Sequence, residues 1–176
     1  MSDYTLGDRT FRSRLIIGSG KYESFEQNRA CADESGAEMV TVALRRTKLD
    51  APTGQGLLDF LPSDRFTILP NTAGCFTAED ALATARMGRE LLGHGLVKLE
   101  VIGDERTLFP DAAATIEAAR ILVDDGFEVL PYITDDPVSC QRESPRSTEL
   151  LLPLKPKVIR RSPSVRTGVT PLALRA

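Results

Sequence analysis

Short apolar segments alternate with longer amphipathic stretches along the first 137 residues of this 176-residue chain. Each apolar segment is rich in Val, Ile or Leu and is followed by a polar turn, a pattern typical of buried strands. The segments that we expect to be strands are 13–17, 38–44, 66–69, 96–102 and 127–133. Strands that alternate with helices of this length indicate βαβ crossovers and hence a parallel sheet.

Capping residues place the boundaries of the predicted helices. Ser24 is a good N-cap for a helix that Gly36 would end, because glycine tolerates the left-handed conformation of a C-terminal cap. Thr77 is expected to begin a strongly helical run that continues to Leu92. A third, amphipathic helix is expected over residues 111–125.

Polar residues gather where the predicted strands end. They are Lys21, Arg45, Arg46, Asn71, Thr72, Asp135 and Asp136, with Lys98 and Glu100 late in the fourth strand. In a (β/α)8 barrel the active site is built at this end of the strands, from several strands at once. We therefore predict an α/β fold of the (β/α)8 TIM-barrel type rather than an open doubly wound sheet.

The length of the chain limits how much of a barrel it can form. A complete barrel needs about 250 residues and seldom has fewer than about 200. Five βα units fill residues 1–137, so the expected domain is a barrel truncated to about five units. Strands 13–17 and 127–133 would then have unpaired edges, and such edges favour aggregation or self-association.

The composition changes at residue 138. Residues 138–176 contain eight Lys or Arg against two Asp or Glu, together with five Pro and five Ser. Prolines at this density interrupt regular elements, so we expect an irregular, disordered tail. Translation in a shifted reading frame would produce such a change, and a natural short variant with an unrelated tail is the alternative.

Charge and rare residues narrow the class of protein. The net charge of −3 argues against nucleic-acid binding, and no apolar run is long enough to cross a membrane. The N-terminus lacks the pattern of a signal peptide, and the three cysteines have neither zinc spacing nor a disulfide pattern. His94 is the only histidine, so no histidine-based metal site is expected. These features predict a cytoplasmic protein.

One lysine stands inside a predicted strand. Side chains alternate along a strand, so Lys98 and Glu100 share a face of segment 96–102. Burial lowers the pKa of an amine, and a neutral lysine can form a Schiff base with a carbonyl while a neighbouring carboxylate moves protons. A purely structural Lys–Glu ion pair has the same spacing. Nothing adjacent to Cys75 in the sequence would activate its thiol, so a nucleophilic role is not expected there.

Four blocks of sequence carry a resemblance to a known family. They are FRSRLIIGSGKY (11–22), LPNTAG (69–74), LVKLEVIGD (96–104) and VLPYITDDP (129–137). In this order and spacing they resemble bacterial thiazole synthase, from about Tyr4 to Pro137, and the resemblance implies a (β/α)8 barrel. The family continues past this point with further strand units and a glycine-rich phosphate-binding turn, which this chain does not show.

The resemblance implies that Lys98 forms an imine with the ketone of 1-deoxy-D-xylulose 5-phosphate while Glu100 moves protons. Sulfur would arrive as the thiocarboxylate of a ubiquitin-like carrier protein, and a separate enzyme would supply dehydroglycine. Asn71, Asp135 and Asp136 are expected to bind substrate, although each could instead cap the following helix. No metal or cofactor is implied, and we expect a homo-oligomer.

Two other functions stay open at this point. One is a different Schiff-base barrel that acts on a sugar phosphate, such as a class I aldolase. The other is a catalytically inactive truncated fragment that at most binds the sulfur carrier or intact synthase subunits.

Overall fold

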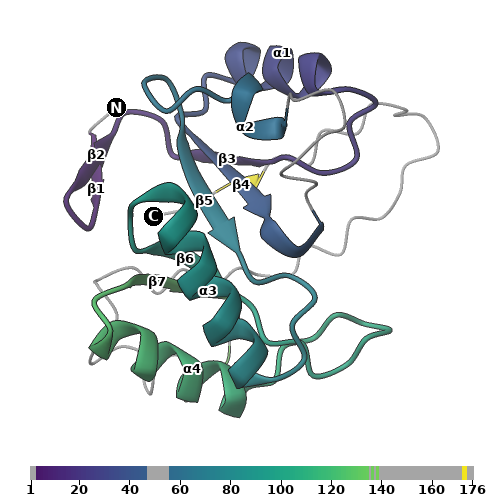
Figure 1. The fold of residues 1–176 in the computed structure, drawn as a ribbon, viewed down its shortest axis with the longest axis vertical. Coiled ribbons are helices and arrows are strands. Elements are labelled where there is room, and N and C mark those ends of the chain that lie inside the picture. Colours follow the sequence, from purple (N-terminus) through teal and green to yellow (C-terminus); the bar gives the residue numbers. More distant parts are fainter. Residues whose placement is uncertain (1–2, 47–55, 135, 137, 139–171, 174–176) are drawn as a thin grey trace.

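The computed structural model describes residues 3–46, 56–134, 136, 138 and 172–173. Its main sheet contains the strands β3 (Leu15–Gly18), β4 (Met39–Ala43), β5 (Thr67–Asn71), β6 (Leu96–Leu99) and β7 (Glu128–Pro131), which are neighbours in sequence order (Figure 1). Every pairing among these strands is parallel. Successive parallel neighbours are the arrangement of consecutive βα units in a barrel, which confirms the predicted partial (β/α) barrel.

Helices connect the consecutive strands. They are α1 (Phe25–Ser35), the 3-10 helix η1 (Leu44–Arg46), α2 (Leu57–Phe60), α3 (Ala78–Leu92) and α4 (Ala112–Asp124). Ser24 Oγ accepts the N–H of Gln27 at 3.2 Å, and Thr77 Oγ1 accepts the N–H of Asp80 at 3.1 Å. Gly36 ends α1 with a φ of 66°. The predicted caps are therefore confirmed.

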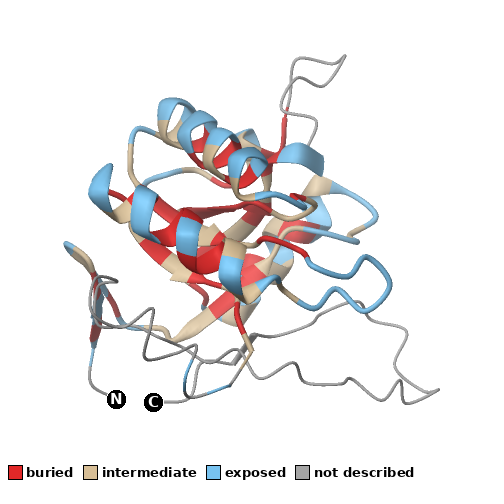
Figure 2. Cartoon of the chain, turned by 90° about the horizontal axis from the view of Figure 1, so that it is seen from below, coloured by how far each residue is buried: buried red, intermediate tan, exposed pale blue. Residues whose placement is uncertain are grey.

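Most strand residues of the main sheet are buried (Figure 2). Their side chains alternate between its two faces, and both faces are covered. On the outer face, Ile17 and Val40 pack with side chains of α1 and α2, and Val97 packs with side chains of α3 and α4. Figure 1 shows the first two helices over the β3 and β4 end of the sheet, and the other two beside β6 and β7. On the inner face, a separate cluster contains Ile16, Met39, Leu69 and Leu96.

An N-terminal hairpin closes the inner apolar cluster. Its strands, β1 (Tyr4–Leu6) and β2 (Arg9–Phe11), pair antiparallel, and the rings of Tyr4 and Phe11 stack with centroids 5.3 Å apart. Both rings and Leu6 are buried against the inner cluster. Gly7 turns the chain with a φ of 59°, and the Glu128 carboxylate occupies the space where a Cβ would stand. The positive φ of the turn favours glycine at this position.

Two features of the sheet differ from the sequence-based expectation. β6 ends at Leu99 rather than at residue 102, because both backbone groups of Glu100 bond to a side chain instead of a neighbouring strand. Strand β8 (Leu172–Ala173) pairs antiparallel with β3, so the prediction of an unpaired edge at residues 13–17 is wrong. Among the described strands, β7 is paired only with β6, which leaves the second expected edge in place.

The described helices include none with the length and apolar character needed to cross a membrane. The longest, α3, has 15 residues and carries several charged side chains. A transmembrane helix needs about 20 predominantly apolar residues.

Glu38, next to β4, binds the segment between the hairpin and β3 through hydrogen bonds. Its carboxylate accepts the backbone N–H groups of Arg12 at 2.7 Å and Ser13 at 3.1 Å, and the Arg12 guanidinium at 3.3 Å. Burial acts to raise the pKa of this carboxyl, but the three donors outweigh burial and hold the pKa of Glu38 below its usual value.

We expect Glu38→Gln to lower the free energy of unfolding by about 1 kcal/mol near neutral pH, because charge-assisted hydrogen bonds are lost. A carboxyl whose pKa is depressed by folding stabilises the protein above its unfolded pKa, and that contribution disappears as the pH falls through the folded pKa. Urea unfolding followed by circular dichroism from about pH 7 to about pH 3 should therefore show a shrinking difference between the two proteins. A difference that stays constant with pH would contradict this account.

Candidate functional site

Three neighbouring strands carry a polar side chain two residues after a buried apolar one on the inner face. The pairs are Met39 and Thr41 on β4, Leu69 and Asn71 on β5, and Leu96 and Lys98 on β6. Because side chains return to the same face every two residues, the polar members form a layer next to the apolar one, nearer the C-terminal ends of the strands. This is the end of the strands at which barrel enzymes build their active sites.

Lys98 and Glu100 meet in this polar layer. Lys98 Nζ lies 2.5 Å from Glu100 Oε1, and the two side chains are only 15% and 12% exposed. The structure therefore brings together the two residues that the sequence singled out. The contact itself fits a structural ion pair as well as an acid–base pair, so the surroundings of the amine matter for its assignment.

Tyr132 is a neighbour of this pair that the sequence analysis did not select. Its ring centroid lies 5.4 Å from Lys98 Nζ, and its hydroxyl donates to the Leu108 carbonyl at 3.4 Å. Burial and then the Glu100 carboxylate raise the pKa of Tyr132, so the phenol stays protonated. Tyr132 follows β7 by one residue, and only the β6–β7 register reveals that it faces the lysine.

Asn71 lies in the same layer and is paired in register with Lys98. Its amide nitrogen donates to Thr41 Oγ1 at 2.9 Å, and its amide oxygen accepts the N–H of Ala73 at 3.2 Å. The side chain that caps the following helix is Thr77, so the alternative in which Asn71 caps that helix is wrong. Asn71 is thus buried and oriented within the site layer.

The two aspartates expected to bind substrate are placed less fully. Asp135 lies outside the described residues. Asp136 is exposed, and its Oδ1 accepts the N–H of Val138 at 3.4 Å. A substrate-binding role for either aspartate stays a prediction.

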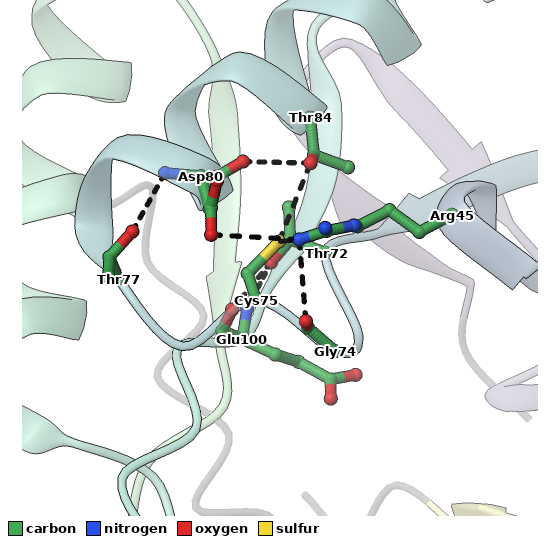
Figure 3. Close-up of polar contacts among 8 residues, drawn as sticks. All are labelled: Arg45, Thr72, Gly74, Cys75, Thr77, Asp80, Thr84 and Glu100. Atoms are coloured by element: carbon green, nitrogen blue, oxygen red, sulfur yellow. Dashed lines mark hydrogen bonds and ion pairs between the residues drawn. The ribbon is translucent and has the colours of Figure 1, made fainter.

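A second polar group joins the loops that follow β4 and β5 on the helix side of the sheet (Figure 3). Arg45 Nη1 lies 3.4 Å from Cys75 Sγ, 3.4 Å from the Gly74 carbonyl and 3.8 Å from Asp80 Oδ2. The structure thus places a cationic side chain beside Cys75, a neighbour that is distant from it in the sequence. The thiol is nevertheless fully enclosed and also contacts Thr84 Oγ1 at 3.4 Å, which suits a structural role.

Within the described part of the chain, no three His, Cys, Asp or Glu side chains converge as metal ligands would. The chemistry available from the described residues is that of an amine beside a carboxylate, bordered by an aromatic ring. Such an arrangement can exchange a proton between the two groups and can form an imine with a carbonyl compound.

Comparisons with known proteins agree with this geometry. The model of the family described as Thiazole biosynthesis protein ThiG matches residues 5–158, a range that extends past Pro137. Thiazole synthase of Nitrosomonas europaea is 51% identical over 156 residues, which cover 88% of this chain and 58% of that protein. Thiazole synthase of Methylococcus capsulatus is 53% identical over 151 residues, which cover 85% of this chain and 56% of that protein.

A solved structure is also similar. The crystal structure of the Amycolatopsis orientalis BexX/CysO complex contains a chain that matches with a TM-score of 0.66 and 34% identity, covering 79% of this chain and 57% of that one. This chain therefore spans less than three-fifths of the length of the relatives named here. The family model and the relatives match most of the sequence, including strand β6 with Lys98. The chain belongs to the Thiazole biosynthesis protein ThiG family.

Proposed function

We propose that this chain carries the imine-forming site of a thiazole synthase. The reaction builds the thiazole phosphate of thiamine from 1-deoxy-D-xylulose 5-phosphate, dehydroglycine and the sulfur of a carrier-protein thiocarboxylate. The observation that supports this most directly is the 2.5 Å contact between Lys98 Nζ and Glu100 Oε1 in the polar layer of the sheet. Membership of the family supports the choice of substrates.

In the proposed mechanism, Glu100 Oε1 first accepts a proton from the Lys98 ammonium. The neutral amine then adds to the ketone carbon of the substrate, forming a C–N bond while the carbonyl electron pair moves to oxygen. Protonated Glu100 gives this proton to the oxygen of the adduct. The carboxylate then carries a second proton from the adduct nitrogen to the same oxygen, which leaves as water and generates the iminium ion. The carboxylate thus ends the step as it began.

The surroundings of the amine suit this sequence of proton transfers. The Tyr132 ring covers one side of Lys98 and limits the access of water. Asn71 provides an amide in the same layer, and we assign it to substrate binding together with Asp135 and Asp136. This proposal needs neither a metal nor a cofactor.

The proposed partners follow from the substrates. A ubiquitin-like carrier would deliver sulfur, and the solved relative in complex with CysO supports a protein partner of this kind. A second enzyme would produce dehydroglycine. We further propose that the protein assembles as a homo-oligomer and acts in the cytoplasm.

The alternative is a catalytically inactive fragment that at most binds the sulfur carrier or intact synthase subunits. In this alternative the contact between Lys98 and Glu100 is a structural ion pair only, which the same 2.5 Å distance fits.

We expect sodium borohydride to trap a covalent adduct of 1-deoxy-D-xylulose 5-phosphate on Lys98, because reduction converts an imine to a stable secondary amine. Intact-mass and peptide mass spectrometry of the full chain would locate the adduct. Lys98→Arg should abolish it, since a guanidinium is always protonated and forms no such imine.

Lys21→Arg is the matched control for trapping. Lys21 lies past the end of β3 and is exposed, so its replacement should leave the adduct unchanged. An unmodified Lys98 in the folded wild-type chain would reject the catalytic proposal and favour the inactive fragment. Trapping with aldose and ketose phosphates alike would point to an aldolase-like specificity instead.

We expect Glu100→Gln to slow imine formation by roughly 100-fold, because the neutral amide cannot pass protons to the substrate oxygen that leaves as water. Rapid quenching with borohydride at a series of times would give the rate. Glu117→Gln, on the exposed side of α4, is the matched control for the loss of one carboxylate. Equal rates in the wild type and Glu100→Gln would assign Glu100 a structural role only.

A further inference from the structure

The Glu100 backbone is held by one side chain from the neighbouring βα unit. Thr72 Oγ1 accepts the N–H of Glu100 at 2.7 Å and donates to the Glu100 carbonyl at 2.7 Å. The Thr72 backbone N–H also donates to the Lys98 carbonyl at 3.2 Å. Thr72 is fully buried, so water does not compete for these bonds.

We propose that Thr72 is a positioning residue that directs the Glu100 carboxylate onto Lys98. This inference rests on the function proposed for Lys98 and Glu100. A hydroxyl can donate one hydrogen bond and accept others at once, so a single Thr72 oxygen can satisfy both backbone groups of Glu100. In effect, the side chain continues the hydrogen-bond ladder of β6 by one residue after the strand has ended.

Glu100 needs such a support because it lies where the chain leaves the sheet. β5 and β6 are paired in register only at Asn71 and Lys98, so their backbone ladder does not reach Glu100. The backbone angles at Glu100 determine where its Cβ points and hence where the carboxylate lies. A displacement of about 1 Å in such a group can cost roughly 100-fold in rate.

The surrounding contacts show that Thr72 acts on this residue in particular. Leu99 and Val101, on either side of Glu100, bond instead to Tyr132 and Asp111. The Tyr132 N–H donates to the Leu99 carbonyl at 2.7 Å, and the Asp111 N–H donates to the Val101 carbonyl at 2.9 Å. Figure 3 shows the Glu100 side chain extending away from the Arg45 and Cys75 group. The Thr72 hydroxyl therefore fixes the residue whose side chain turns toward the lysine.

The test measures the Lys98–Glu100 contact without any sugar substrate. A small amine-directed reagent, trinitrobenzenesulfonate, labels the folded full chain at fixed pH, and peptide mass spectrometry gives the rate at Lys98 relative to exposed Lys21. Glu100→Gln should raise this relative rate roughly tenfold, because the amine is no longer engaged in its 2.5 Å contact with the carboxylate. Thr72→Val, which keeps the shape and removes the hydroxyl, should raise it to a similar value. Thr72→Ser, which keeps the hydroxyl, should restore the wild-type rate.

Thr115→Val is the control for losing a buried hydroxyl. Thr115 is fully buried, and its Oγ1 donates to the Asp111 carbonyl at 2.7 Å within the first turn of α4. This change should lower the thermal midpoint without altering the labelling of Lys98. A role of Thr72 in stability alone would make Thr72→Val behave in the same way and would overturn the proposal.

The remaining outcomes also decide the matter. If Glu100→Gln leaves the labelling of Lys98 unchanged, the pair does not control the amine and the positioning role is wrong. If Thr72→Val loses its native circular dichroism spectrum, Thr72→Cys takes its place, since a thiol is a weaker donor and acceptor, and the same two results apply. Failure of the wild-type chain to form the borohydride adduct would reject the proposed function. The labelling ratios would still test whether Thr72 positions Glu100 against Lys98.

Discussion

The alternation of side chains along the parallel strands is the constraint on which the rest of this structure depends. It divides each strand between an outer face, packed on helices, and an inner face, packed on the N-terminal hairpin. It also puts Lys98 on the inner face, two residues beyond Leu96. A shift of one residue in the β6 register would place Val97 on the inner face, in the site. It would place Lys98 on the outer face, against the side chains of α3 and α4. The packing of the helices and the placement of the amine are thus set by the same register.

Keeping two charges in this layer has an energetic consequence. Removing an ionised group from water costs several kcal/mol, and a close partner of opposite charge offsets much of that cost. Lys98 and Glu100 are such partners for each other, with Nζ and Oε1 2.5 Å apart, and the Tyr132 ring also contacts Lys98 Nζ. Either charge alone would be unfavourable in such a place. The residues best suited to chemistry are therefore also the ones that depend most on each other for their burial.

Much of this arrangement can be predicted from local sequence patterns. The parallel strands, the caps at Ser24 and Thr77, and the common face of Lys98 and Glu100 all follow from short-range periodicity and capping rules. The hairpin was missed because strands of three residues are too short to establish a period. The approach of Arg45 to Cys75 could not be foreseen either. These residues are 30 positions apart, and they meet only because β4 and β5 are adjacent in the sheet.

The N-terminal hairpin has a consequence for the order in which the chain can acquire its structure. Tyr4, Leu6 and Phe11 pack on Leu96 and alongside Leu130, which are synthesised much later than they are. Strands β3 to β5 can pair as they emerge, whereas the hairpin must wait until β6 has joined them. The contacts that close the base of the sheet therefore join residues that are far apart in sequence, so the hairpin residues settle only after later strands have formed.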